Sequence, residues 1–306
     1  MASQVVNGKA FEWAVAKAIS EEIGREILDD SSSRYAHACF GKLPADKQRE
    51  FGASAMSAAR HVLKIEQQNV AVSDPEYIEI AGDERGKRGD VRDVLIVAKR
   101  GELGFSCKNN HDALKHSRLS PRIDFVSKWG IDASGCSDEY WDAVRPLFES
   151  LSTIKAESEG SRLFAEIEDV GVTYYQPLLS AFAAELERVM GAGARAPADA
   201  AGEFVKYIIG RSDFYKVMNL QGQTSIQGFN FGGSLNVPKS KMPTQLVSLD
   251  RYDGGQFAVT TRFNRGYAFN FRIHNASSRV EPSFKFDVRG VSFGTEVDQH
   301  HITDTL

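Results

Sequence analysis

The feature that most constrains this chain is the stretch GDVRDVLIVAKRGELGFSCKNN, residues 89–110. Two apolar runs, residues 94–98 and 103–107, are separated by a short turn that contains Gly101. Short apolar runs joined by a glycine-containing turn predict two neighbouring strands of a β-hairpin. Asp93 precedes the first strand and Lys108 ends the second, so antiparallel pairing brings a carboxylate and an ammonium group within a few ångströms of each other.

Such a pair is suited to phosphodiester hydrolysis. The two groups can share a divalent cation and a water molecule, and hard cations such as Mg²⁺ prefer carboxylate and carbonyl oxygens. The metal polarises a phosphoryl oxygen, and a lysine beside it stabilises the charge that develops in the transition state. A solvated surface hairpin that begins with Asp and ends with Lys is the alternative interpretation of the same residues.

The order acid, strand, turn, strand, lysine resembles the shared motif of the PD-(D/E)xK nuclease superfamily. Two longer stretches are more specific. GDVRDVLI…GFSCKNNHDALKHSRLS, residues 89–120, and FNFRIHNASSRVEPSFKFDV, residues 269–288, resemble blocks of the HaeIII-type restriction endonuclease family. GKAFEWAVA, residues 8–16, also fits the N-terminal helix of that family, so the resemblance spans the beginning, middle and end of the chain.

The resemblance implies an α/β (α+β) fold in which a mixed β-sheet is flanked by helices, with a β-rich C-terminal region for DNA recognition. It implies a type II restriction endonuclease that uses Mg²⁺ to hydrolyse double-stranded DNA at a short, GC-rich palindrome such as GGCC, leaving 5′-phosphate ends. The functional partner would be a cognate DNA methyltransferase. A palindromic site favours a homodimer, although a monomer that nicks each strand in turn is the other option.

The same resemblance assigns Asp93 to the metal and Lys108 to the attacking water and the developing charge. The motif has Asp or Glu two residues before the lysine, but this chain has Ser106, whose hydroxyl does not replace the charge of a carboxylate. A second metal-binding acid is therefore expected from elsewhere. Glu12 on the predicted N-terminal helix is the first candidate.

Other residues near the hairpin are also considered. Asp90 and the backbone carbonyl of Cys107 are further possible metal ligands, and Glu102 and Asp112 are rival acids. His111 and His116 are interpreted as polar residues on a helix that packs beside the site, because their spacing is not that of a zinc site.

We predict that the chain is organised in two contiguous segments, with one continuous domain as the alternative. Helical periodicity before and after the hairpin indicates a helical and β nuclease core over residues 1–190. GAGARAPADAAG, residues 191–202, is typical of a linker. Beyond residue 213 the runs are short, aromatic and β-branched, and Gly, Asn and Asp separate them. Residues 191–306 are therefore expected to form a linker and a β-rich DNA-recognition region.

The charge distribution supports a local DNA-binding surface. The chain has a net charge of −4, but residues 205–285 contain eleven Lys and Arg against four Asp and Glu, which makes this segment +7 and the remainder −11. Such an asymmetry is what a DNA-reading surface needs. The predicted DNA-binding residues are Arg262, Asn264, Arg265, Arg272, His274, Asn275, Lys239 and Lys241.

Alternation along residues 269–275 places three apolar side chains on one face of a strand and Asn270, Arg272 and His274 on the other. Arginine grips guanine O6 and N7 with two hydrogen bonds, so this face suits base recognition. Lys239 and Lys241 suit phosphate contacts, because lysine acts as a point charge. A strand whose polar face simply meets water is the alternative.

Three cysteines without a CxxC pair argue against a disulfide framework, and no apolar run has the length of a membrane span. A cytoplasmic protein is expected. Two other functions remain open at this point: a sequence-specific DNA-binding protein on an inactive nuclease core, and a structure-specific repair nuclease.

Overall fold

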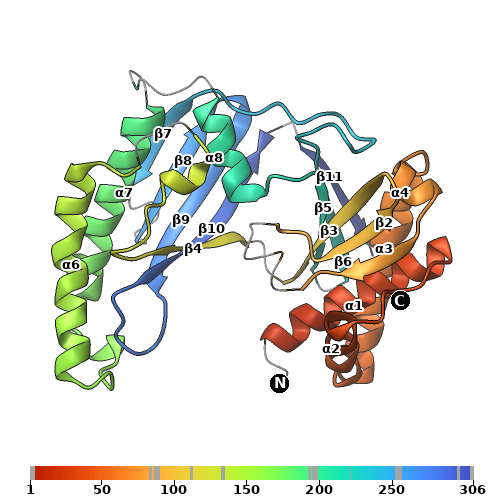
Figure 1. The fold of residues 1–306 in the computed structure, drawn as a ribbon, viewed down its shortest axis with the longest axis horizontal. Helices are drawn as coiled ribbons and strands as arrows, with labels where there is room; N and C mark the ends of the chain where they lie inside the picture. The colour runs from red at the N-terminus through yellow and green to blue at the C-terminus, as the bar shows by residue number, and fades with distance from the viewer. Residues whose placement is uncertain are drawn as a thin grey trace. The chain divides into compact units, whose positions relative to one another are not determined.

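The structure is a computed structural model that describes residues 4–82, 85, 90–110, 113–131, 135–191, 194, 199–220, 222–251, 257–294 and 297–303. The chain forms two compact units, each assembled from separate stretches (Figure 1). The first unit contains residues 1–112, 210–241 and 295–306, and the second contains residues 113–209 and 242–294.

The first unit is built on a six-stranded mixed sheet with the order β1-β2-β3-β5-β6-β11. β3 and β5 pair in parallel, and the other neighbours are antiparallel. Parallel neighbours need a long crossover connection, and residues 113–209 of the second unit lie in that connection. The strands are β1 Tyr77–Ile80, β2 Val94–Ala98, β3 Gly101–Asn109, β5 Phe214–Asn219, β6 Gln223–Phe229 and β11 Asp298–Thr303.

Helices cover one face of this sheet. The bounds are α1 Gln4–Ile23, α2 Ser31–Gly41, α3 Ala45–Ile65 and α4 Val70–Ser73. Phe11, Val15 and Ile19 recur at helical spacing on α1 and are buried in one core with Phe105 and Val217 of the sheet. This amphipathic pattern is the one that predicts the N-terminal helix from sequence.

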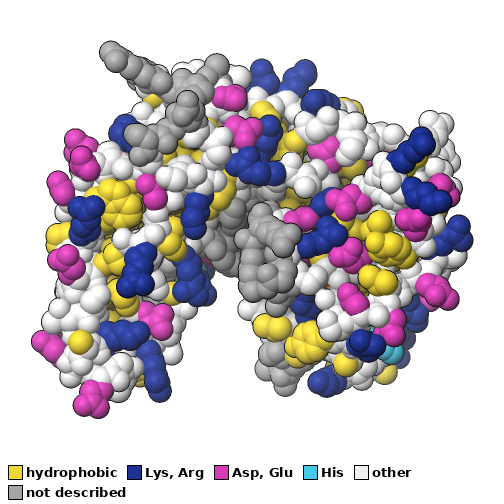
Figure 2. Space-filling model, in the orientation of Figure 1, with side chains coloured by type: hydrophobic (Ala, Val, Ile, Leu, Met, Phe, Trp, Pro, Cys, Tyr) yellow, Lys and Arg dark blue, Asp and Glu magenta, His cyan; other side chains and the backbone are white. Residues whose placement is uncertain are grey.

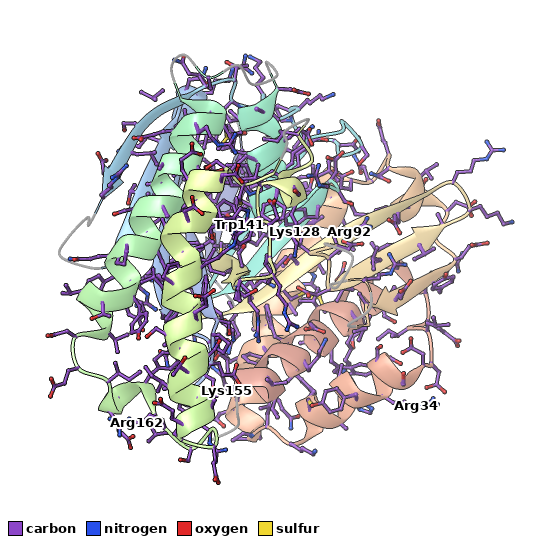
Figure 3. The ribbon with its side chains drawn as sticks, turned by 60° about the vertical axis from the view of Figure 1, so that its left-hand side comes forward. Arg34, Arg92, Lys128, Trp141, Lys155 and Arg162 are labelled. Carbon is purple, nitrogen blue, oxygen red and sulfur yellow. The ribbon has the colours of Figure 1, made fainter. Side chains whose placement is uncertain are left out.

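The β2–β3 hairpin forms as the sequence predicts. Ala98 pairs with Gly101, so only Lys99 and Arg100 make the turn. The Arg92 side chain (Figure 3) lies across Gly104 of β3, where an added Cβ would stand 2.2 Å from Arg92 Cδ. A glycine is needed here because any larger residue would displace this arginine.

The second unit is built on a five-stranded antiparallel sheet with the order β4-β10-β9-β8-β7. Phe182 of α7 anchors it to the helices, with its ring 4.6 Å from that of Phe286 and 5.2 Å from that of Phe271. In Figure 3, Trp141 lies near the beginning of α6 and Lys155 near its end. The elements are β4 Ala113–Leu119, α6 Asp138–Glu157, α7 Gln176–Met190, α8 Ala200–Ile209, β7 Leu246–Arg251, β8 Ala258–Phe263, β9 Tyr267–Asn275 and β10 Phe284–Phe293. Among the described residues, no helix is both long and apolar enough to cross a membrane.

Two expectations about organisation differ from the structure. The grouping into units does not follow the proposed division near residue 190: β5, β6 and β11 complete the first sheet, whereas β4 and the helices that follow it join the second unit. Residues 113–119, which include His116, form a strand, so the helix interpretation of His116 was wrong. In both cases strand pairing with distant segments, which local sequence does not encode, decides the outcome.

We expect Phe271→Ala to lower the free energy of unfolding by about 3–5 kcal/mol, because it leaves a cavity among well-packed aromatic rings. Urea unfolding followed by circular dichroism measures this. Val291→Ala, at a side chain 54% exposed on β10, is the matched control and should change stability by about 0.5 kcal/mol or less. Equal effects of the two substitutions would contradict the packing described here.

Candidate active site

The hairpin brings Asp93 and Lys108 into contact. Val94 pairs with Phe105 at the start of β2, and the N–H of Asp93, one residue earlier, donates to the Phe105 carbonyl at 2.7 Å, which holds Asp93 against β3. Lys108 Nζ lies 3.2 Å from Asp93 Oδ2, and the two side chains are 28% and 25% exposed. The predicted pairing of carboxylate and ammonium is therefore present in the geometry, at the edge where β2 begins.

Three donors converge on Asp93 Oδ2. The backbone N–H of Cys107 donates at 2.7 Å, the Ser106 hydroxyl at 3.2 Å and the Lys108 ammonium at 3.2 Å. Oδ1 takes no part in these three bonds. The carboxylate is thus fixed in orientation by β3, with one oxygen turned away from these donors.

Ser106 occupies the position at which the nuclease motif has an acid. Its side chain is buried, and its hydroxyl donates to Asp93 rather than replacing a charge. A carboxylate at this position would place a second negative charge directly against Asp93. The serine therefore supports Asp93 through a hydrogen bond and supplies no second carboxylate.

Glu12 of α1 is the first sequence candidate for the second acid, and its surroundings in the structure are distinctive. Its side chain is only 9% exposed, and Lys9, one turn earlier, donates to Oε2 at 2.9 Å. Burial raises the pKa of the Glu12 carboxyl, the nearby charge of Asp93 raises it further, and Lys9 and Lys108 oppose the rise, which leaves the pKa at about 7. The negative charge of Asp93 therefore disfavours ionisation of Glu12.

The charge of Asp93 also raises the pKa values of two side chains of β3, Lys108 and Cys107. Burial alone would lower the pKa of Lys108, but the charge of Asp93 and its hydrogen bond outweigh this, so the pKa is raised. Burial, then the charges of Asp93 and Glu12, raise the pKa of the Cys107 thiol well above its ordinary value. Lys108 is thus cationic at neutral pH, and Cys107 is not a thiolate.

The Cys107 backbone is the part of that residue that faces the site. Its N–H points to the Asp93 carboxylate, and in a strand the N–H and C=O of one residue point to the same side. The carbonyl is therefore directed to the β2 side of β3, beyond the first residue of β2.

Asp90 is bound elsewhere. Arg92 donates to both of its oxygens at 2.8 Å, through Nε to Oδ1 and through Nη2 to Oδ2. Burial opposes it, but these bonds lower the pKa of the Asp90 carboxyl. Arg92 also lies 2.6 Å from Glu102. The geometry favours Glu12 over Asp90 and Glu102 as the partner of Asp93, while His111 and Asp112 lie outside the described residues.

The residues at this edge fit a hard divalent cation. Within the described ranges no group of three or more His, Cys, Asp or Glu side chains is placed to hold a metal. Mg²⁺ nevertheless binds through one or two carboxylates together with waters and substrate phosphate. Glu12 and Asp93 supply two carboxylates whose mutual repulsion a cation would relieve. The donor chemistry therefore suits Mg²⁺ and not a softer metal.

The predicted recognition strand has the alternation that its sequence indicates. Phe269, Phe271 and Ile273 of β9 are buried, whereas Arg272 is exposed and His274 is half-buried. The buried residues face α7 and α8, as the contacts of Phe271 with Phe182 and Phe204 show. The other face of this sheet is polar.

The remaining predicted DNA-binding residues occupy different settings. Arg262 on β8 pairs with Asp250 at 3.1 Å, and Arg265 donates to the Met242 carbonyl at 2.7 Å. Asn264 accepts from Thr244 N at 2.9 Å and so fastens the strand-connecting segment.

Asn275 lies at the end of β9, and the two lysines predicted to bind DNA lie in a loop. Asn275 donates to the Ser277 carbonyl, within its own loop. Lys239 and Lys241 are exposed on either side of the buried Ser240, which anchors their loop through a bond of 2.8 Å from its N–H to the Asn230 carbonyl. On the face shown in Figure 2, basic and acidic side chains are interspersed, in keeping with the small net charge.

Comparison with known families matches residues 8–293 to the HaeIII restriction endonuclease family. The chain belongs to the HaeIII restriction endonuclease family. It is 33% identical to the type II restriction enzyme HaeIII of Haemophilus aegyptius, over 92% of each chain. It is accordingly a type II restriction endonuclease, a site-specific deoxyribonuclease that binds DNA. No solved structure matches this chain.

In this HaeIII-family enzyme, sequence reasoning missed two lysines near the hairpin. Lys9 contacts Glu12, and the signal for it was the three-residue spacing within one helical turn. Lys216 was counted with the recognition region, but it lies on β5 in register with Ser106 and is 3% exposed. No local signal reveals this, because the parallel pairing of β3 and β5 joins segments about a hundred residues apart.

The raised pKa of Glu12 predicts a pH-dependent stability in EDTA. The folded state holds this proton up to about pH 7, whereas the unfolded chain loses it near pH 4.5, so stability falls as pH rises through this window. Glu12→Gln should therefore become more stable than wild type by up to about 3 kcal/mol at pH 8, with the gain vanishing near pH 4.5. Urea unfolding at several pH values measures it.

Glu21→Gln is the matched control for this measurement, because Glu21 lies on the same helix with its side chain 52% exposed. A difference between Glu12→Gln and wild type that stays constant from pH 5 to pH 8 would contradict the assigned burial of Glu12.

Proposed function

We propose that this enzyme hydrolyses one phosphodiester bond in each strand of duplex DNA, within a short, GC-rich palindrome of the GGCC type, and leaves 5′-phosphate ends. The observation that carries the proposal is the 3.2 Å contact of Lys108 with Asp93, together with a buried carboxyl, Glu12, whose pKa responds to the charges of both. The membership of the HaeIII restriction endonuclease family supports the choice of DNA as substrate.

Asp93 and Glu12 would hold Mg²⁺, and the Cys107 carbonyl would add a ligand. Asp90 is the alternative second metal ligand, although Arg92 donates hydrogen bonds to both of its carboxylate oxygens. Mg²⁺ bound at this edge supplies Lewis-acid polarisation of the scissile phosphate and lowers the pKa of water.

Lys108 acts as a cation in this proposal. Its raised pKa keeps it protonated at neutral pH, so it donates hydrogen bonds and positive charge and does not serve as a general base. From its position beside Asp93 it orients the attacking water and stabilises the negative charge that builds on the phosphate oxygens. Ser106 and the Cys107 N–H keep Asp93 in place while this happens.

Recognition is assigned to residues on both units. Arg262, Arg272 and His274 lie on strands of the second sheet, and we propose that they meet base edges, together with Asn264, Arg265 and Asn275 in the adjoining turns. Lys239 and Lys241, exposed on their loop, are proposed as phosphate contacts.

The biological setting follows from the same activity. A palindromic site is matched by two-fold symmetry, so we propose that a homodimer cuts both strands. A cognate DNA methyltransferase would protect the host sites, and both enzymes would work in the cytoplasm. Cys39, Cys107 and Cys136 are free thiols in the structure, as a reducing compartment requires.

Lys108→Ala should lower the rate of DNA cleavage by about 100–1,000-fold, because a cation is lost beside the reacting phosphate. Plasmid digestion with Mg²⁺ or EDTA, followed by electrophoresis and end-mapping, measures this. Lys99→Ala, at an exposed lysine in the β2–β3 turn, is the control and should cut like wild type.

Discrete bands that require both Mg²⁺ and Lys108 would support the proposal, and ligation of the ends would test for the 5′-phosphate. Wild-type cleavage by Lys108→Ala would overturn the catalytic assignment. A featureless smear would indicate a structure-specific nuclease, and intact DNA that still shifts in a binding gel would indicate an inactive nuclease core.

The metal requirement should depend on pH through Glu12. A carboxylate must lose its proton to bind a metal. As pH rises toward 7, the half-saturating Mg²⁺ concentration should therefore fall by about tenfold for each pH unit, and above pH 7 it should level off. Cleavage rates over a Mg²⁺ series at pH 5.5–8.5 measure this. Lys9→Gln should move the levelling-off to higher pH, because Lys9 lowers the pKa of Glu12. A Mg²⁺ requirement that is independent of pH would argue against Glu12 as a ligand.

A further inference from the structure

The polar face of the second sheet carries two arginines on neighbouring strands, with one buried carboxylate between them. Asp287 of β10 pairs in register with Arg272 of β9, and Arg289 stands two residues further along β10, opposite Asn270. Residues two apart on a strand share a face, so the three charged side chains lie together. Phe286 and Val288, on the opposite face, are buried in the core.

The carboxylate contacts both guanidinium groups. Arg272 Nη2 and Arg289 Nη2 each lie 3.3 Å from the same oxygen, Asp287 Oδ2. The two nitrogens are therefore within twice that distance of each other. The Asp287 side chain is 5% exposed, whereas those of Arg272 and Arg289 are 46% and 47% exposed. The acid lies beneath the surface, and the arginines extend above it.

This arrangement suits base reading better than phosphate binding. A phosphate contact needs positive charge, and a carboxylate between two arginines removes part of that charge. What Asp287 provides is orientation, because it engages one nitrogen of each planar guanidinium and reduces the repulsion between the two cations. A pre-oriented guanidinium fork is what bidentate recognition of guanine O6 and N7 requires.

The neighbouring polar residue does not compete for the same role. The Asn270 amide nitrogen donates to Thr260 Oγ1 at 2.9 Å, so Asn270 is tied to β8. Bidentate adenine recognition would need that amide nitrogen to turn toward a base. The pair of arginines is thus the part of this face whose geometry matches one base in particular.

We propose that Arg272 and Arg289, oriented by Asp287, read two adjacent guanines of the recognition site from the major groove. Adjacent bases stack about 3.4 Å apart along a strand, a spacing that two guanidinium groups sharing one carboxylate oxygen can span. Arg272 and Arg289 contact the bases, and Asp287 is a positioning residue. The inference rests on the proposed GGCC-type function and names the groups that supply its specificity.

The test is a binding experiment on the Lys108→Ala enzyme with Ca²⁺ in place of Mg²⁺. The probes are a GGCC-containing duplex, duplexes with one guanine replaced by 7-deazaguanine, which lacks the N7 acceptor, and duplexes with one base pair of the site exchanged. Arg289→Lys, Arg272→Lys and Asp287→Asn are each added to this parent. Fluorescence anisotropy gives the affinities, and a salt series gives the number of phosphate contacts.

We expect each arginine substitution to weaken binding to the GGCC duplex by about 10–100-fold, with little change for exchanged duplexes and an unchanged salt slope. One 7-deazaguanine should weaken the parent by about tenfold and leave the matching Lys variant unaffected. Asp287→Asn should lose discrimination at both guanines. A residue that only stabilises the sheet would not produce this coupling between one side chain and one base atom.

Arg162→Lys and Glu166→Gln are matched controls. Arg162, labelled in Figure 3, is 47% exposed and lies 3.3 Å from Glu166, like Arg289 from Asp287, but it follows α6 and is not on the sheet. Neither control should change discrimination. Thermal melting confirms folding, and if Asp287→Asn unfolds, the two Lys variants decide.

Equal loss on all duplexes with a lower salt slope would mean phosphate contacts and would overturn the inference. So would an equal 7-deazaguanine effect in the parent and both Lys variants. In those cases a parent that still prefers GGCC leaves the proposed function standing. A parent that does not distinguish the duplexes at all would overturn both.

Discussion

One oxygen atom, Asp93 Oδ2, organises the edge of the first sheet that we propose as the active site. It accepts hydrogen bonds from the Cys107 backbone, the Ser106 hydroxyl and the Lys108 ammonium, all on β3. β2 and β3 are paired from Val94 onward, so the backbone that carries this carboxylate and its three donors is held by the sheet. Rigid elements of this kind hold catalytic groups more accurately than loops do.

The charged groups around that oxygen lower the stability of the fold when Glu12 is ionised, and a bound cation would offset this cost. Glu12 is buried near Asp93, and its pKa of about 7 records the cost of holding a second negative charge there. Lys9 and Lys108 offset part of that cost. Ser106 avoids a third carboxylate. A strongly perturbed carboxyl beside another charged group is typical of sites that bind a cation or transfer charge, and Glu12 lies on a helix and not on the strand motif.

The parallel pairing of β3 with β5 organises the rest of the chain. It requires a long excursion between neighbouring strands, and the residues of that excursion contribute β4, α6, α7 and α8 to the second unit. The two sheets are consequently not built from successive segments of the chain. In the second unit a buried carboxylate, Asp287, contacts two partly exposed arginines, Arg272 and Arg289.

Much of the site could be predicted from the sequence because its signals are local. The hairpin, the terminal positions of Asp93 and Lys108, and the alternation along residues 269–275 each follow from residues a few positions apart. Glu12 could be named as a candidate, because its helix is amphipathic and the resemblance to the family covers it. Ser106 could be seen to lack the expected charge, but its hydrogen bond to Asp93 could not be seen.

The sequence by itself determined the hairpin, its two charged ends and the amphipathic helices and strands, since these depend on short-range periodicity. Only the tertiary structure decided which strands share a sheet, because backbone pairing joins residues regardless of their separation along the chain. Long-range pairing therefore buries Lys216 beside Ser106 and places Asp287 between two arginines. The folded chain also decides that Glu12 is buried where the charge of Asp93 raises its pKa, because burial and neighbouring charge depend on tertiary packing.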